Sequence, residues 1–175
     1  MLINIIGNIA TGKSTLAKQL SSDLSIPVLS IDAKREHHYT GDMIGEIAAQ
    51  QALNHSLSVY SRINKSVILE HCGIGIRSKD YYKHFNNSRI ITVACTIPIE
   101  QSLTNINNRK DTIIPLVPKH WMDSDDLVEA QLIACKQMDA KQFNIIPDAY
   151  YDYNNGKYQE LLQWLKREGA SGNCK

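Results

Sequence analysis

The sequence predicts an α/β fold in three layers, in which a five-stranded parallel sheet carries helices on both faces. One pattern in the sequence predicts it. Short apolar runs alternate with longer segments of helical periodicity, and parallel strands joined by crossover helices produce this pattern. The expected strands are residues 2–6, 26–31, 66–69, 90–95 and 149–153, and the expected helices are 15–24, 41–63, 79–85, 98–107 and two that begin near 123 and 158.

The helices are expected because their apolar residues recur every three or four positions. In segment 98–107, Pro98 and Glu100 mark a helix start. Acidic residues at 123–126 suit the first turn of the next helix, where they favour the helix dipole. In the long segment 41–63, the apolar side is expected to begin with Ile44, Ile47 and Ala48 and to continue with Leu53, Leu57 and Tyr60.

A glycine-rich loop follows the first expected strand. Residues 7–14 read G-N-I-A-T-G-K-S, which is the Walker A pattern G-x-x-x-x-G-K-[ST] between a strand and an amphipathic helix. Backbone N–H groups of such a loop surround a phosphate, and the helix start adds donors and a positive dipole end. The chain is therefore expected to bind a nucleoside triphosphate through Gly7, Asn8, Ile9, Ala10, Thr11, Gly12, Lys13, Ser14 and Thr15.

Three side chains of this loop have specific expected roles. Lys13 can reach the β- and γ-phosphates, Ser14 can hold Mg²⁺, and Thr15 can reach the α-phosphate. We therefore interpret the fold as a P-loop NTPase that binds a nucleoside triphosphate with Mg²⁺; this pattern alone does not choose ATP over GTP.

Parallel sheets bind ligands at the carboxyl ends of their strands. Asp32 ends the second expected strand and Glu70 the third, so both should face the phosphate loop. Asp32 can accept the proton of an attacking hydroxyl, and Arg35 can hold the acceptor or a phosphate oxygen. The alternative is a turn-capping Asp32 and a solvated Arg35. Glu70 can act as a Walker B acid for Mg²⁺ or contact the acceptor.

Further candidates follow along the chain. Gly73, Gly75 and Arg77 can bring backbone and a guanidinium close to a substrate, although a plain turn explains them equally well. Arg109 opens a proline-bearing segment, expected to form a lid at about 108–123. A lid arginine can stabilise the charge on a transferring phosphoryl group, and a solvated arginine is the alternative.

Composition bounds the class of protein. The chain has 175 residues, of which 43% are hydrophobic and 21% charged, as expected for one domain spanning 1–175. No apolar run approaches the roughly 20 residues that span a bilayer. The four cysteines form no C-x-x-C, so we expect reduced thiols, a cytoplasmic location and no membrane partner. The net charge of +1 makes long nucleic acid the less favoured partner.

The Walker A loop at 7–14, the Asp32-x-x-Arg35 pair and an arginine before a proline-bearing segment together resemble the P-loop kinases. Among these, the chain is most similar to the 5′-kinase domain of polynucleotide kinases and to zeta-toxin-like kinases. The resemblance implies ATP as donor, a hydroxyl acceptor activated by Asp32, Arg35 as a ligand of the acceptor or a phosphate, and Arg109 closing on the transferring group. The chain departs from the pattern in having no second acid beside Asp32 and no basic bias.

The expected activity is transfer of the γ-phosphoryl group of ATP to a small metabolite, nucleoside or nucleotide. The catalytic residues would be Lys13, Asp32, Arg35 and Arg109. A polynucleotide 5′-hydroxyl kinase and a toxin-type sugar-nucleotide kinase are the alternatives within the enzymes. The alternative from another class is a nucleotide-dependent switch, although no N-K-x-D guanine signature is present.

Overall fold

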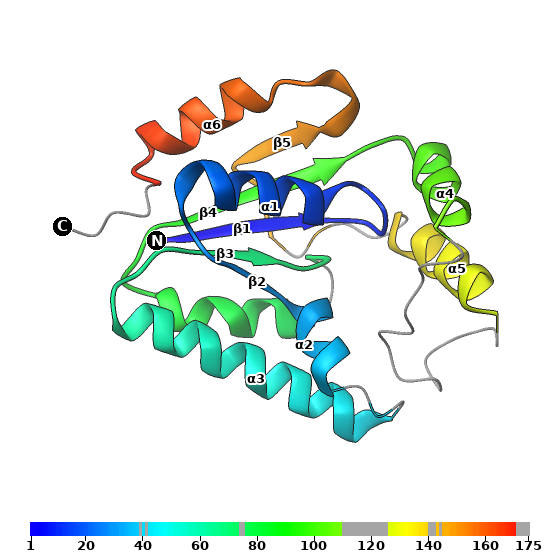
Figure 1. Ribbon diagram of the computed structural model, residues 1–175, viewed down its shortest axis with the longest axis horizontal. Helices are drawn as coiled ribbons and strands as arrows, with labels where there is room; N and C mark the ends of the chain where they lie inside the picture. Colours follow the sequence, from blue (N-terminus) through cyan, green and yellow to red (C-terminus); the bar gives the residue numbers. More distant parts are fainter. Residues whose placement is uncertain are drawn as a thin grey trace.

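The computed structural model describes residues 1–38, 40, 42–73, 76–109, 126–139, 143 and 145–170, without the side chains of 76–79. Strands and helices alternate along the chain (Figure 1). The elements are β1 (Leu2–Gly7), α1 (Lys13–Leu24), β2 (Val28–Ser30), α2 (Ile31–His38), α3 (Met43–Arg62), β3 (Val67–Glu70), the 3₁₀ helix η1 (Ile76–Phe85), β4 (Ile90–Thr96), α4 (Ile99–Asn107), α5 (Leu127–Asp139), β5 (Ala149–Asp152), the 3₁₀ turn η4 (Tyr153–Asn155) and α6 (Tyr158–Arg167).

The sheet has five strands in the order β2-β3-β1-β4-β5, and every pairing is parallel. β1 lies at the centre and is buried along its whole length. Its register places Gly7 opposite Cys95 of β4 and Ile5 opposite Glu70 of β3. The carboxyl ends of β1, β3 and β4 therefore meet at one edge of the sheet, and the fold predicted from the sequence is confirmed.

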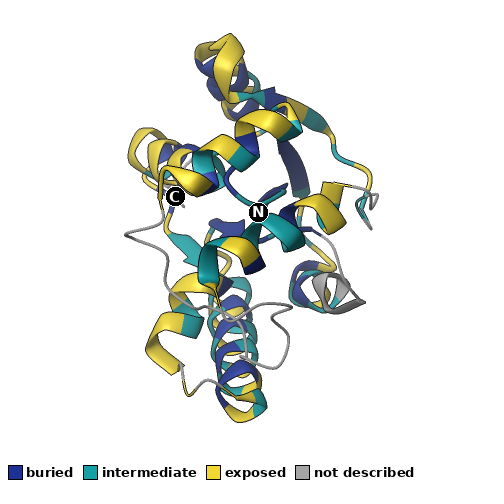
Figure 2. Ribbon diagram, turned by 90° about the vertical axis from the view of Figure 1, so that its right-hand side faces the viewer, coloured by how far each residue is buried: buried dark blue, intermediate teal, exposed yellow. Residues whose placement is uncertain are grey.

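Helices cover both faces of the sheet, which makes three layers. α1 and α6 pack on one face, where the core includes Ile3, Ile5, Leu16, Leu20, Leu161 and Leu165. α3 and η1 pack on the other face, where the core includes Leu2, Leu53, Leu57, Val67, Leu69 and Phe85. Figure 2 shows buried residues on the strands and on the inner sides of the helices. Each aliphatic side chain buried in these layers stabilises the folded state by about 1.5–3 kcal/mol. Because the apolar residues alternate between strands and helices, burying them together favours the layered fold.

The second strand is shorter than predicted. β2 spans only Val28–Ser30 instead of 26–31, and Asp32 lies in the first turn of α2 rather than at a strand end. β2 pairs with β3 alone, and that pairing ends where Ser30 meets Glu70. Beyond this point the hydroxyl of Ser30 accepts the N–H of Asp32 at 3.2 Å. The chain therefore turns into a helix as soon as its pairing partner ends.

The predicted apolar side of the long helix was wrong at its start. Ile44 and Ile47 of α3 are exposed, whereas Glu46 is buried together with Ala49, Leu53 and Leu57. The buried positions 46, 49, 53 and 57 form a continuous helical stripe, so a carboxylate occupies the first place on the core-facing side. Its partner on α2, described below, accounts for this placement.

In the part of the chain that the structure describes, no helix is both long enough and apolar enough to cross a membrane.

Candidate phosphate and acceptor site

The loop between β1 and α1 is built on two glycines with positive φ. At Gly7, with φ of 155°, a Cβ would lie 2.6 Å from the carbonyl oxygen of Cys95. At Gly12, with φ of 88°, it would lie 3.1 Å from the ring of Tyr153. Gly12 is also the N-cap of α1 and has no side chain to occupy the N–H groups of the first turn. These donors suit an anion, as the Walker A pattern predicts.

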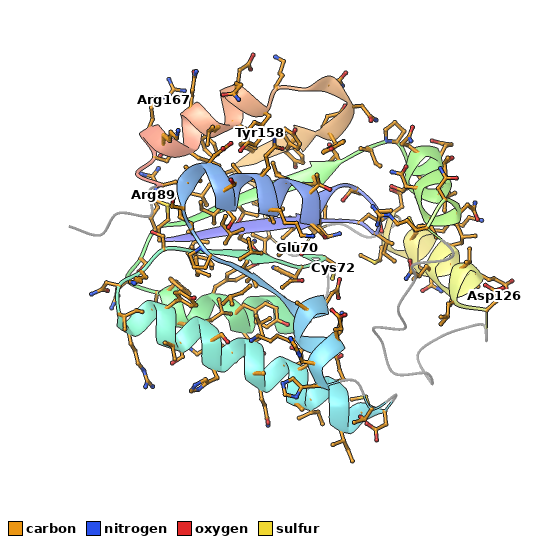
Figure 3. The ribbon with its side chains drawn as sticks, viewed as in Figure 1. Glu70, Cys72, Arg89, Asp126, Tyr158 and Arg167 are labelled. Atoms are coloured by element: carbon orange, nitrogen blue, oxygen red, sulfur yellow. The ribbon has the colours of Figure 1, made fainter. Side chains whose placement is uncertain are left out.

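Lys13 and Ser14 provide the charged and hydroxyl groups of the loop. The ammonium of Lys13 donates to the backbone carbonyl of Asn8 at 2.6 Å, so it lies back over the loop. The Ser14 hydroxyl donates to Oε1 of Glu70 at 2.8 Å, across from α1 to the end of β3. Figure 3 shows Glu70 and Cys72 where β3 ends, beside the start of α1.

The Ser14 and Glu70 pair fits a magnesium ion chemically. Mg²⁺ prefers hard oxygen ligands, usually one or two from the protein together with phosphate oxygens and water. Glu70 is buried, and its hydrogen bond to Ser14 places a carboxylate and a hydroxyl side by side next to the phosphate loop. These two groups are the residues that would hold the ion.

Two helices support the loop from the far side. The amide of Asn8 donates to the carbonyl of Cys135 in α5 at 2.9 Å, and the amide of Asn105 in α4 donates to the carbonyl of Ala10 at 3.1 Å. Ala10, Ile106 and Cys135 form a small buried cluster between the three segments. α4 and α5 lie together next to this end of the sheet (Figure 1). The cradle is therefore held in shape by side chains distant in sequence.

His71, directly after Glu70, is buried and orders the turn that follows β3. Its Nδ1 accepts the backbone N–H of Gly73 at 3.1 Å. Since that nitrogen is an acceptor, the proton is on Nε2, which donates to Oδ1 of Asn4 at 2.9 Å. Burial, followed by the charge of Lys13, lowers the pKa of His71 from 6.5 to about 3, so the imidazole is neutral. A neutral histidine therefore fixes Gly73, whose φ is 75°.

Asp32 and Arg35 form an ion pair on α2. Nη1 of Arg35 lies 2.8 Å from Oδ1 of Asp32, whose side chain is 50% exposed. Arg35 also contacts Glu46 of α3 with two nitrogens, Nε to Oε2 at 2.8 Å and Nη2 to Oε1 at 3.0 Å. Burial alone would lower the pKa of Arg35, but the bonds to Glu46 and the charges of both carboxylates raise it above its ordinary value. The guanidinium is a permanent cation held between two carboxylates.

A cavity of about 230 Å³ opens beside the loop, on the side away from Asp32 and β2. Its wall combines the loop and the start of α1 with the end of α4 and the segments after β4 and β5. The lining residues are Ala10, Thr11, Gly12, Thr15, Ile97, Asn105, Asn108, Arg109, Tyr153 and Asn154.

The structure brings together most of the candidates expected from the sequence. The loop at 7–15, Glu70 and Gly73 gather where β1 and β3 end, and Asp32 and Arg35 follow the adjoining strand β2. Arg109 lies apart from that pair, in the wall of the cavity just after α4. Gly75, the side chain of Arg77 and residues 110–125 of the expected lid lie outside the described part of the chain.

Sequence reasoning missed Tyr153, Asn154, Asn105 and Asn108 of the cavity wall, as well as Glu46. The strand-end rule could have found Tyr153 and Asn154, because both directly follow β5. Glu46 could have been found as the acidic residue in phase with Ala49, Leu53 and Leu57. For Asn105 and Asn108 the sequence offers no signal beyond their place at the end of α4.

Solved structures with this arrangement include several kinases. A proposed kinase from Chloroflexus aurantiacus has a TM-score of 0.71 at 20% identity, covering 95% of this chain and 96% of that chain. Shikimate kinase from Acinetobacter baumannii, solved with shikimate, has a TM-score of 0.60 at 17% identity, covering 99% and 95%. A chain of the Pnkp1/Rnl/Hen1 RNA repair complex has a TM-score of 0.59 at 17% identity, covering 83% and 47%.

No protein-family model matches the chain, and no curated protein matches its sequence. The likeness is therefore one of fold, and the five-stranded parallel sheet with its glycine loop has the fold of the P-loop kinases.

Proposed function

We propose that this protein is a kinase that transfers the γ-phosphoryl group of ATP to a hydroxyl group of a small acceptor. One observation carries the proposal. A glycine loop shaped for an anion and a carboxylate that can serve as a base follow strands at the same edge of one sheet, with Glu70 on the strand between them. Kinase chemistry needs this combination of an anion cradle, a metal ligand and a base.

Each residue of the site has its own role in the proposed reaction. The N–H groups of the loop and the ammonium of Lys13 would bind the β- and γ-phosphates, with Lys13 exchanging the Asn8 carbonyl for a phosphate oxygen. Mg²⁺ held by Ser14 and Glu70 would neutralise charge on those phosphates. The acceptor oxygen attacks the γ-phosphorus, the bond to the bridging oxygen breaks, and ADP leaves. Asp32 takes the proton of the acceptor hydroxyl.

The cavity beside the loop is proposed to hold the base of ATP. Its volume of about 230 Å³ is below the usual range for a whole small-molecule ligand, so it suits one part of a nucleotide whose phosphates lie in the loop. The ring of Tyr153 and the amides of Asn105 and Asn108 offer an aromatic surface and hydrogen bonds. Arg109 in the same wall adds a cation at the start of the expected lid.

The acceptor is proposed to be a small metabolite, nucleoside or nucleotide. One structural neighbour was solved with shikimate and another belongs to an RNA repair complex, so a small metabolite and a nucleic-acid end are the two acceptors to compare. The near-zero net charge of this chain favours the small acceptor. A 5′-hydroxyl oligonucleotide is the acceptor to test against it.

The test is transfer from ATP labelled at the γ-phosphate to a panel of nucleosides, nucleotides, sugars, shikimate and a 5′-hydroxyl oligonucleotide. We expect label in at least one small acceptor, its loss in Lys13→Ala, and unchanged transfer in Lys18→Ala, a matched exposed lysine of α1. Asp32→Asn should bind ATP normally while transfer falls by a factor on the order of 10².

Two results would contradict the proposal. Release of phosphate to water with every acceptor would favour a nucleotide-dependent switch. Failure of the wild-type protein to bind Mg·ATP in a calorimetric titration would remove the nucleotide site altogether.

A further inference from the structure

A line of polar side chains connects Asp32 to the core on the α3 side of the sheet. Arg35 bonds Asp32 with Nη1 and Glu46 with Nε and Nη2. Glu46 also accepts a hydrogen bond from the amide of Gln50 at 2.7 Å, and the oxygen of Gln50 accepts the Tyr81 hydroxyl at 2.8 Å. The line therefore runs from an exposed carboxylate on α2 through α3 to η1.

Burial increases from Asp32 through Arg35 to Glu46. The side chain of Asp32 is 50% exposed, that of Arg35 18% and that of Glu46 2%. A buried carboxylate on the core stripe of α3 is costly in an apolar surrounding and is retained where it has a partner or a task. Here its charged partner is Arg35, which also contacts the candidate base Asp32. Glu46, at the buried end, is thus held in place, whereas Asp32, at the exposed end, is the carboxylate that an acceptor can reach.

Close packing of α2 against α3 makes the contact possible. A Cβ at Gly45 would lie 2.5 Å from the carbonyl oxygen of His38, so only a glycine lets the end of α2 approach this closely. Asp42 caps α3 by accepting the N–H groups of Ile44 and Gly45, each at 3.0 Å. The cap and the glycine together set where Glu46 emerges, one residue after Gly45.

We propose that Glu46 is a positioning residue for phosphoryl transfer, holding Arg35 as an internal counter-ion that orients the carboxylate of Asp32. This inference rests on the proposed function. It means that Arg35 pairs with carboxylates of the protein itself and does not bind an anionic group of the acceptor. Two carboxylates around one guanidinium leave the group with a formal net charge of −1, so an acceptor anion gains little by approaching it. The acceptor at this position is accordingly an uncharged hydroxyl-bearing group.

The first experiment separates positioning from acceptor binding. The double variant Arg35→Met/Glu46→Leu replaces the ion pair by apolar side chains of similar size, a change that folded proteins often tolerate. With the best acceptor of the panel, we expect kcat to fall at least tenfold, while the acceptor KM and the Kd for ATP stay within about twofold. Glu46→Asp, which keeps a carboxylate, should retain more of the wild-type kcat than the double variant does. A raised acceptor KM with unchanged kcat would overturn the proposal, because Arg35 would then be an acceptor ligand.

The second experiment asks whether the effect passes through Asp32. In an Asp32→Asn background, the double variant should reduce kcat by less than twofold further, because the carboxylate that it positions is already gone. A full additional tenfold loss there would show a general structural defect and overturn the proposal. Should the double variant fold poorly, Glu46→Gln, which keeps the side-chain shape, takes its place in the same cycle.

A third measurement needs no acceptor and therefore separates this inference from the proposed function. In ¹⁵N NMR spectra, the Nε–H of Arg35 should exchange slowly with water in the wild-type protein and in Asp32→Asn, and rapidly in Glu46→Gln. The carboxyl ¹³C resonance of Asp32 should shift in Glu46→Gln. The positioning role would be refuted if the Arg35 Nε–H exchanged rapidly in the wild-type protein, or if the Asp32 carboxyl resonance did not shift in Glu46→Gln. Both results can be obtained even if no acceptor is phosphorylated.

Discussion

Acid should destabilise this protein through His71, a buried imidazole at the end of β3. Its pKa is lowered from 6.5 to about 3 by burial and by the charge of Lys13. In the unfolded chain the same imidazole binds a proton near its ordinary pKa. The unfolded state therefore gains protons first as the pH falls, and folding loses stability between about pH 6.5 and pH 3.

The two pKa values set the magnitude. At about pH 8 both states are neutral at His71, and the residue adds no pH dependence. At about pH 5 the unfolded imidazole is almost fully protonated while the folded one is not, which costs about 2 kcal/mol of unfolding free energy. That is a large part of the roughly 5–15 kcal/mol by which a domain is usually stable.

Urea unfolding at the two pH values measures this cost, and His71→Asn isolates it. Asparagine places an amide oxygen where Nδ1 accepts the N–H of Gly73, but it does not titrate. Other groups contribute equally to both proteins, so the wild type should lose about 2 kcal/mol more than the variant between pH 8 and pH 5. Equal losses in the two proteins would refute the assignment of His71 as a neutral buried residue.

Three further predictions, two of them with a matched control variant, test the cradle and its surroundings. Tyr153→Ala should raise the Kd for ATP about tenfold by calorimetry, whereas Tyr153→Phe should not, because the ring supplies the cavity wall. Glu70→Gln should raise the Mg²⁺ concentration needed for half-maximal transfer, and an unchanged magnesium titration would remove Glu70 from the metal site. Gly7→Ala should lower the free energy of unfolding in urea by about 3 kcal/mol, because its Cβ would lie 2.6 Å from the Cys95 carbonyl oxygen. Gly156 also has a positive φ but has open space around it, so Gly156→Ala should lower that free energy by only about 1 kcal/mol.

The sequence predicted the fold because each strand and most helices carry their own periodic signal. The apolar runs at 2–6 and 90–95 became β1 and β4 with a difference of one residue at the carboxyl end, and the step of four from Leu16 to Leu24 became the buried side of α1. Such signals are local, and burying them in one core has few layered solutions. The glycine loop was equally readable, because its backbone shape depends on the identity of a few residues in a row.

The proposed acceptor side was less predictable because tertiary contacts decide more of its structure. Ile44 and Ile47 suggested an apolar side for the start of α3, yet both are exposed and Glu46 is buried. The phase of Ala49, Leu53 and Leu57 includes position 46, but no periodicity in α3 can report the partner of Glu46, because Arg35 lies on a different helix. The cavity wall is similar, since Tyr153 and Asn105 line one cavity only because β4 and β5 are neighbours in the sheet.

The two halves of the site are anchored differently, and this explains why an ion pair stands behind Asp32. The phosphate loop continues a fully buried central strand and is bonded to α4 and α5. Asp32 follows β2, an edge strand of three residues that is only partly buried and pairs on one side. An edge strand this short gives a following side chain little positional restraint, so the base proposed there needs a second anchor. Arg35 of α2 supplies that anchor through its ion pair with Glu46 of α3, the longest helix of the described chain, and a carboxylate on the core stripe of α3 is the structural consequence.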